Sequence, residues 1–205
     1  MTRADRPSTL ARRPSGWKVV GAGFAIMGIS SGVTFYSMSA FLNGLVEQRG
    51  FSLAVASAGP TMSSIAGALG GLFTAWLMQR MTVRMIVAIG AVGMGGAMML
   101  IGASHTIWQL WAAFALSGWF GAMTSGIPVT SLVARWFPIA PAKPLVLAQT
   151  GMSVGGALLP PVVLSIVNGW GLTAGGLLLG GLMIAVLFGA AMFMREPPDD
   201  PGKAK

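Results

Sequence analysis

Residues 85–103 read MIVAIGAVGMGGAMMLIGA, a run without any charged, hydroxyl or amide side chain. A helix needs about 20 mostly apolar residues to cross the hydrocarbon core of a bilayer, so this stretch is long enough to span a membrane. Residues 174–194 form a second stretch of the same kind. Neither stretch shows the alternation of apolar and polar residues that is typical of a membrane β-barrel strand.

The composition of the whole chain agrees with these two stretches. Of 205 residues, 54% are hydrophobic and 9% are charged, and the mean hydropathy is +0.74. A soluble domain carries about 25% charged residues, which is far more than this chain has. The chain contains no cysteine, which excludes a disulfide framework and thiolate metal sites. The sequence therefore predicts an all-α integral membrane protein.

Uncharged stretches of sufficient length recur along the chain, and they predict a six-helix transmembrane bundle over residues 19–194. The predicted spans are residues 19–45, 53–78, 85–103, 107–134, 144–166 and 172–194. Residues 1–18 form a basic N-terminal tail, and residues 195–205 form a polar C-terminal tail. The first apolar run is longer than the roughly 7–15 residues of a signal-peptide core, so we interpret it as a retained helix.

The basic residues predict the orientation of this bundle. Of the 13 Lys and Arg residues, only Arg49 lies in an odd-numbered connection between the predicted spans. Because positive charge is retained in the cytoplasm, both tails are predicted to be cytoplasmic, in a multi-pass protein of the cell (inner) membrane. Topology thereby accounts for the net charge of +8, and no nucleic-acid partner is predicted.

The predicted spans contain no Asp, Glu, Lys, Arg or His. Charges within a span usually mark ion pathways, so the compensating charge for any charged substrate has to come from elsewhere. The single histidine, His105, has no second metal ligand nearby in the sequence, and there is no intramembrane aspartate pair or Ser–His set. Neither enzyme activity nor a metal site or cofactor is therefore predicted.

Uncharged polar residues follow a repeated order along the spans. The first, second, fourth and fifth spans carry several of them, whereas the third and sixth carry none in their central stretches. Polar side chains tend to face other helices, so we predict that the third and sixth spans are peripheral. The order polar, polar, apolar occurs twice, which predicts a 3+3 inverted repeat of the kind found in secondary transporters.

Helical spacing places polar residues on common faces of the spans. In the fourth span, one face carries Ser117, Gly121, Thr124, Pro128 and Ser131. The residues predicted to line a substrate cavity are Thr34, Tyr36, Ser37, Thr124, Gln149 and Ser153. Each hydroxyl could instead serve helix–helix packing, and for Tyr36 and Gln149 cavity lining and packing remain equal alternatives.

Two connections between the spans carry family-like motifs. Residues 75–84 read AWLMQRMTVR and resemble the pattern G-x-x-x-D-R-x-G-x-R at Arg80 and Arg84, with Gln79 in place of the aspartate. Residues 136–151 read WFPIAPAKPLVLAQTG and resemble Y-F-x-K-R-R-x-L-A-x-G-L-A-x-A-G, with the basic pair replaced. The chain thus resembles the major facilitator superfamily, specifically the first six-helix half of its monocarboxylate and oxalate/formate porter branch.

The resemblance implies half of an alternating-access secondary transporter of a small organic anion such as a monocarboxylate. It also implies that Arg80 and Arg84 belong to a cytoplasmic gate, although a role in topology alone is an equal alternative. Besides the lipid bilayer and a small-molecule substrate, the expected partner is a second six-helix half, either a separate chain or another copy of this one. The alternative is a non-transporting six-helix membrane protein, either an assembly partner or a truncated transporter fragment.

Overall fold

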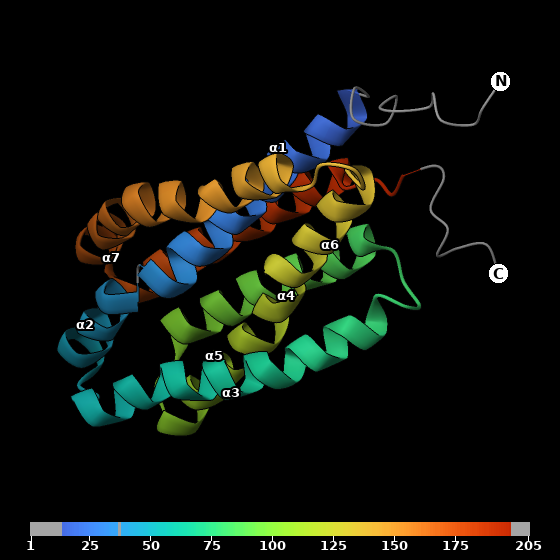
Figure 1. The fold of residues 1–205 in the computed structure, drawn as a ribbon. Coiled ribbons are helices and arrows are strands. Elements are labelled where there is room, and N and C mark those ends of the chain that lie inside the picture. Colours follow the sequence, from blue (N-terminus) through green and yellow to red (C-terminus); the bar gives the residue numbers. More distant parts are fainter. Residues whose placement is uncertain (1–13, 37, 198–205) are drawn as a thin grey trace, which may run out of the picture.

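The computed structural model describes residues 14–36 and 38–197, which fold into a bundle of helices (Figure 1). These described residues contain no β-strand, so the prediction of an all-helical chain is confirmed. The elements are α1 (Pro14–Ser31), the π-helix η1 (Gly32–Tyr36), α2 (Met38–Arg49), α3 (Leu53–Leu77), α4 (Val83–Ala103), α5 (Ile107–Met123), α6 (Gly126–Trp136) and α7 (Ala142–Phe193).

Three helical segments are long and apolar enough to cross a membrane: Gly16–Arg49, α4 and α7. The first of them joins α1, η1 and α2 into one path. With 52 residues, α7 is more than twice as long as a single crossing requires. The structure therefore has the apolar helices of a membrane protein, while the number of six crossings remains a prediction.

Helix α7 folds back on itself at Gly171. This residue has φ 81° and ψ 165°, a conformation that is essentially restricted to glycine. A Cβ built on Gly175 would lie 3.2 Å from Val167 Cγ2. In a straight helix these two residues would lie about 12 Å apart along the axis. We therefore describe α7 as a first limb (residues 142–170) and a second limb (residues 172–193), which form a hairpin (Figure 1).

Gln48, near the end of α2, stabilises this reversal. Its Nε2 donates to the backbone carbonyl of Val167 at 3.3 Å, and its Oε1 accepts from the backbone N–H of Leu172 at 2.7 Å. A helix that is interrupted leaves backbone groups without partners, and such groups are costly in lipid. The single amide of Gln48 supplies partners on both sides of the break.

We expect Gln48→Leu to lower the free energy of unfolding by about 1–3 kcal/mol, because it leaves the Val167 carbonyl and the Leu172 N–H without these partners. Unfolding of the purified protein in mixed micelles, followed by loss of helicity, measures this change. Gln79→Leu is the matched control, because the Gln79 side chain is exposed like that of Gln48 but makes no such hydrogen bonds with the described residues, and it should change the value by less than about 0.5 kcal/mol. Equal values for both variants would show that Gln48 does not hold the reversal.

Glycines bring three pairs of helices into backbone contact. The first limb of α7 lies against α1, α5 lies against α3, and the second limb of α7 lies against α4. Glycines that meet across these pairs include Gly28 and Gly155, Gly67 and Gly118, and Gly102 and Gly176. Small residues permit such approach without a side chain between the backbones. The first two pairs run in parallel and the third runs antiparallel (Figure 1).

Basic side chains gather at one end of the bundle, which we call the basic end. The start of α1, the α3–α4 and α6–α7 connections and the end of α7 lie together there (Figure 1). Its described basic residues are Lys18, Arg80, Arg84, Arg135, Lys143 and Arg195. Arg49 lies at the opposite end, where its guanidinium donates to the carbonyl of Gly102 at 3.0 Å and to Thr173 Oγ1 at 2.5 Å. This exception to the charge bias thus joins three helices.

Helix α4, predicted to be peripheral as the third span, has one buried side and one exposed apolar side, which includes Met85, Val92 and Leu100. Helix α4 packs against both α5 and α7, and its buried residues recur along its whole length, from Val83 to Gly102. By contrast, the buried residues of the more polar α3 are Ala56, Gly59, Gly70 and Thr74. Apolar side chains pack against one another inside this chain, and the polar spans keep faces that the chain itself does not cover.

Candidate functional site

A cavity of about 480 Å³ lies between the helices. Its polar lining comes from α1, η1, α3, α5, the α5–α6 connection and α7. The polar residues are Ser30, Ser31, Thr34, Ser63, Ser64, Ser117, Thr124, Ser125 and Gln149. Met27, Met94 and Met152 contribute thioethers, and the described residues that line the cavity include no charged side chain. The cavity is therefore large enough for a small molecule and is neutral.

The structure brings together three of the six predicted cavity residues. Thr34, Thr124 and Gln149 line the cavity, whereas Ser153 is exposed and does not line it. Side chains four residues apart on a helix differ by about 40° in direction, which accounts for the different surroundings of Gln149 and Ser153. The Tyr36 backbone belongs to η1, but its side chain and all of Ser37 lie outside the described residues. A role in substrate binding remains a prediction for all six.

Several cavity hydroxyls donate their hydrogen bonds to backbone carbonyls of their own helix. Ser117 Oγ donates to the carbonyl of Phe114 at 2.7 Å, and Ser64 Oγ donates to the carbonyl of Pro60 at 2.9 Å. A hydroxyl has one donor and two acceptor lone pairs, so these groups offer mainly acceptors to a molecule in the cavity. This part of the wall suits hydrogen-bond-donating or neutral groups better than an isolated anion.

The predicted fourth span is interrupted at the cavity wall, between α5 and α6. Thr124 is fully buried there, and its Oγ1 lies 3.2 Å from the Gly121 carbonyl oxygen and 3.1 Å from Met94 Sδ. A threonine that bonds to the preceding turn competes with regular helix formation. The single polar face that we predicted up to Ser131 therefore does not continue, and Ser131 is not among the cavity residues.

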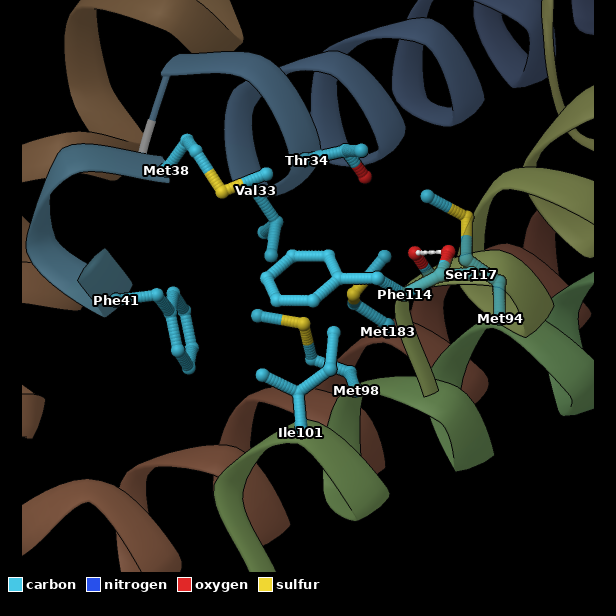
Figure 2. A pocket seen from close by; sticks show the side chains of 10 residues that line it. All are labelled: Val33, Thr34, Met38, Phe41, Met94, Met98, Ile101, Phe114, Ser117 and Met183. Carbon is cyan, nitrogen blue, oxygen red and sulfur yellow. Dashed lines mark hydrogen bonds between the residues drawn. The ribbon is translucent and has the colours of Figure 1, made fainter. Parts of the chain in front are cut away.

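An apolar cluster fills the bundle on the side of the cavity away from the basic end. It surrounds a hollow of about 20 Å³, with room for about one water molecule, which shares Thr34, Met94 and Ser117 with the cavity. Figure 2 shows the other lining residues around Phe114: Val33, Met38, Phe41, Met98, Ile101 and Met183. From this cluster the cavity extends toward the basic end, as far as Gly71 of α3 and Gln149 of α7.

Comparison with protein families identifies the chain at the level of a superfamily. The family model described as Major Facilitator Superfamily matches residues 19–205. The chain belongs to the major facilitator superfamily. Members of this superfamily are transporters, so the chain is a membrane transport protein and the neutral cavity is its candidate substrate site. A comparison with curated proteins gives no match.

The two predicted gate arginines of this major facilitator chain contact different residues. Arg80 Cζ lies 4.5 Å from the ring centroid of Trp76, a cation–π contact on the surface of α3. Arg84 Nη2 lies 2.8 Å from Met192 Sδ, at the end of α7. The described contacts of each arginine are thus local and different, and a shared role in a gate stays a prediction.

Reasoning from the sequence missed all six serines that line the cavity of this major facilitator chain. Those residues are Ser30, Ser31, Ser63, Ser64, Ser117 and Ser125. Each is a polar residue of a predicted span, but spacing within one helix cannot show which faces of different helices meet. Their position along the predicted spans could have identified them, because they lie in the interior of the spans, as Thr34 and Thr124 do.

Proposed function

We propose that the chain is one half of an alternating-access secondary transporter of a small organic anion such as a monocarboxylate. The observation that carries the transport of a small molecule is the hydroxyl-lined cavity of about 480 Å³ within a major facilitator protein. Cavities of about 300–1,000 Å³ are typical of small-molecule sites. The choice of an organic anion rests on the resemblance of residues 136–151 to the monocarboxylate and oxalate/formate porter branch.

The helix pairs support six crossings arranged as two inverted three-helix repeats. If the two limbs of α7 are the fifth and sixth crossings, close contacts join the first with the fifth, the second with the fourth and the third with the sixth. If the first, second and third crossings exchange places with the fourth, fifth and sixth, the same three pairs of crossings are in contact. A twofold relation between two three-helix units would produce that property. The charge of the basic end supports cytoplasmic tails in the cell membrane.

Uncovered polar faces support a second six-helix half. The exposed polar residues on α3 and on the first limb of α7 include Thr61, Ser64, Gln149, Thr150 and Ser153. Polar side chains within a span normally face protein or a wet cavity rather than lipid. A second half, whether a separate chain or another copy of this one, would cover these faces and close the cavity on that side.

Cysteine labelling tests whether the cavity holds water, and the absence of native cysteine gives a clean background. We expect Ser64→Cys and Gln149→Cys to react with a small charged thiol reagent at least about tenfold faster than cysteines facing lipid, because the reactive thiolate forms poorly in apolar surroundings. Leu100→Cys and Leu182→Cys are the controls, since these leucines are 52% and 45% exposed on apolar faces of α4 and α7.

Uniformly slow labelling at all four positions would contradict the proposal. It would favour the non-transporting alternative, in which the hydroxyls serve helix packing. Fast labelling at Ser64 and Gln149 alone would show that water fills the cavity. Exposure of the isolated chain could not explain that result, because the control leucines are comparably exposed.

A further inference from the structure

A second hollow, of about 350 Å³, lies at the basic end and shares no lining residue with the neutral cavity. Its lining residues come from α1, from α4 and from the end of α7. They are Lys18, Arg84, Met192, Phe193 and Arg195. Three cations from three distant parts of the sequence therefore surround one space, which we call the basic hollow.

Among the residues that the structure describes, cations outnumber carboxylates at the basic hollow. Glu196 follows Arg195, and its Oε1 accepts from the backbone N–H of Val83 at 3.4 Å, at the start of α4. Glu196 and the lining residues together give three cations and one carboxylate in the described part of the chain. Like charges around one space repel, so an anion inside it would be attracted by all three.

The basic hollow also has an apolar edge. Met192 and Phe193 are 47% and 59% exposed, and Phe188, one turn deeper on the same side of α7, is 43% exposed. The contact between Arg84 Nη2 and Met192 Sδ places the guanidinium where the apolar surface of α7 meets the basic end. The combination offers cations to a headgroup and an apolar strip to an acyl chain.

We propose that the basic hollow binds an anionic phospholipid of the leaflet at the basic end. The headgroup phosphate lies among Lys18, Arg84 and Arg195, and an acyl chain follows α7 along Met192 and Phe188. A guanidinium can hold two phosphate oxygens at once, and an ammonium group adds a point charge. Basic pockets between membrane helices bind such headgroups. Free phosphate would bind the same cations as the headgroup but would not contact the apolar strip.

Lipid retention by the purified full chain tests this proposal. The protein in detergent is incubated with phosphatidylglycerol or phosphatidylcholine, and the retained lipid is quantified by mass spectrometry. We expect phosphatidylglycerol to be retained preferentially. Lys18→Gln and Arg195→Gln should each weaken its retention about fivefold, which is the contribution of one basic residue near an anionic surface. Both residues are exposed, so these variants should keep the fold.

Arg80→Gln and Lys143→Gln are the matched controls, because both residues lie at the basic end but do not line the hollow. They should change retention by less than about twofold, since they contribute only to the general charge of that end. Equal losses in the controls would overturn the proposal and indicate unspecific attraction. Displacement of the lipid by millimolar inorganic phosphate, with no effect of Phe188→Ser, would assign the hollow to free phosphate instead.

Discussion

Gly155→Ala is expected to lower the free energy of unfolding by about 3 kcal/mol, at the upper end of the range for overpacking. A Cβ at this position would overlap the backbone carbonyl of Gly28, and a Cβ on Gly151 would overlap that of Phe24. A backbone carbonyl cannot rotate away as a side chain can. The extra methyl group would therefore force α1 and the first limb of α7 apart.

Gly189→Ala, in the same helix, is the control for this prediction. A Cβ on Gly189 would meet nothing within 4 Å, so the substitution should raise stability by about 0.5 kcal/mol through the loss of backbone freedom in the unfolded chain. Unfolding in mixed micelles, followed by circular dichroism, measures both variants. Small changes of the same sign at both positions would be incompatible with the close contact between the two helices.

Vesicles that contain only this chain are expected to accumulate no monocarboxylate. The described residues that line the cavity include no cation, and the hydroxyls of Ser64 and Ser117 already donate to backbone carbonyls. A single charge in the centre of a membrane costs about 2.5–3.5 kcal/mol even on a scale derived from helix insertion. A second copy of the chain would repeat the same neutral lining, whereas a partner half with Arg or Lys in a span would supply the missing charge.

Three preparations separate these possibilities: the chain alone, a crosslinked dimer, and the chain reconstituted with a six-helix half that carries a cation within a span. Counterflow of radiolabelled monocarboxylate should occur only in the third preparation. Replacing the cation of that half by Gln should abolish the counterflow, which provides its control. Robust accumulation by the chain alone would show that the bound substrate is neutral or that no cation is needed. Inactivity in all three would favour the non-transporting alternative.

The fold class was predictable because it depends on properties summed over long stretches, and the superfamily was predictable from the motifs at residues 75–84 and 136–151. The apolar run 85–103 is enough to predict a membrane-length helix, and α4 occupies Val83–Ala103. Charge segregation was predictable for the same reason, since only Arg49 departs from the bias. These predictions need no knowledge of which side chains meet.

The local departures from regular helix could not be predicted in this way. Predicting the faces of a helix assumes 3.6 residues per turn. Because η1 is a π-helix with longer-range bonds, residues before and after Gly32–Tyr36 do not lie on the faces that this spacing predicts. Gly171 lies in the predicted connection between residues 166 and 172, but the sequence does not show that the helix continues up to residue 170 and reverses at this one glycine. Its partner Gln48 lies 124 residues from Leu172, a distance that sequence patterns do not connect.

The surroundings of α4 could be predicted only in part. An apolar side chain can face lipid or the protein interior, because both are apolar. Met94 and Met98 of α4 are buried against neighbouring helices, whereas Met85 and Leu100 of the same helix are exposed. Composition alone therefore could not show which side of α4 lies inside the bundle.

The loop-free reversal of α7 also bears on how the chain is made. Residues 144–194 carry no charge, so the insertion machinery would have no hydrophilic segment to pass across the bilayer between the two limbs. We expect both limbs to enter the lipid together, as a hairpin. The amide that completes their turn belongs to α2, which leaves the ribosome long before α7 does. The turn of α7 is thus completed by a side chain that was synthesised much earlier.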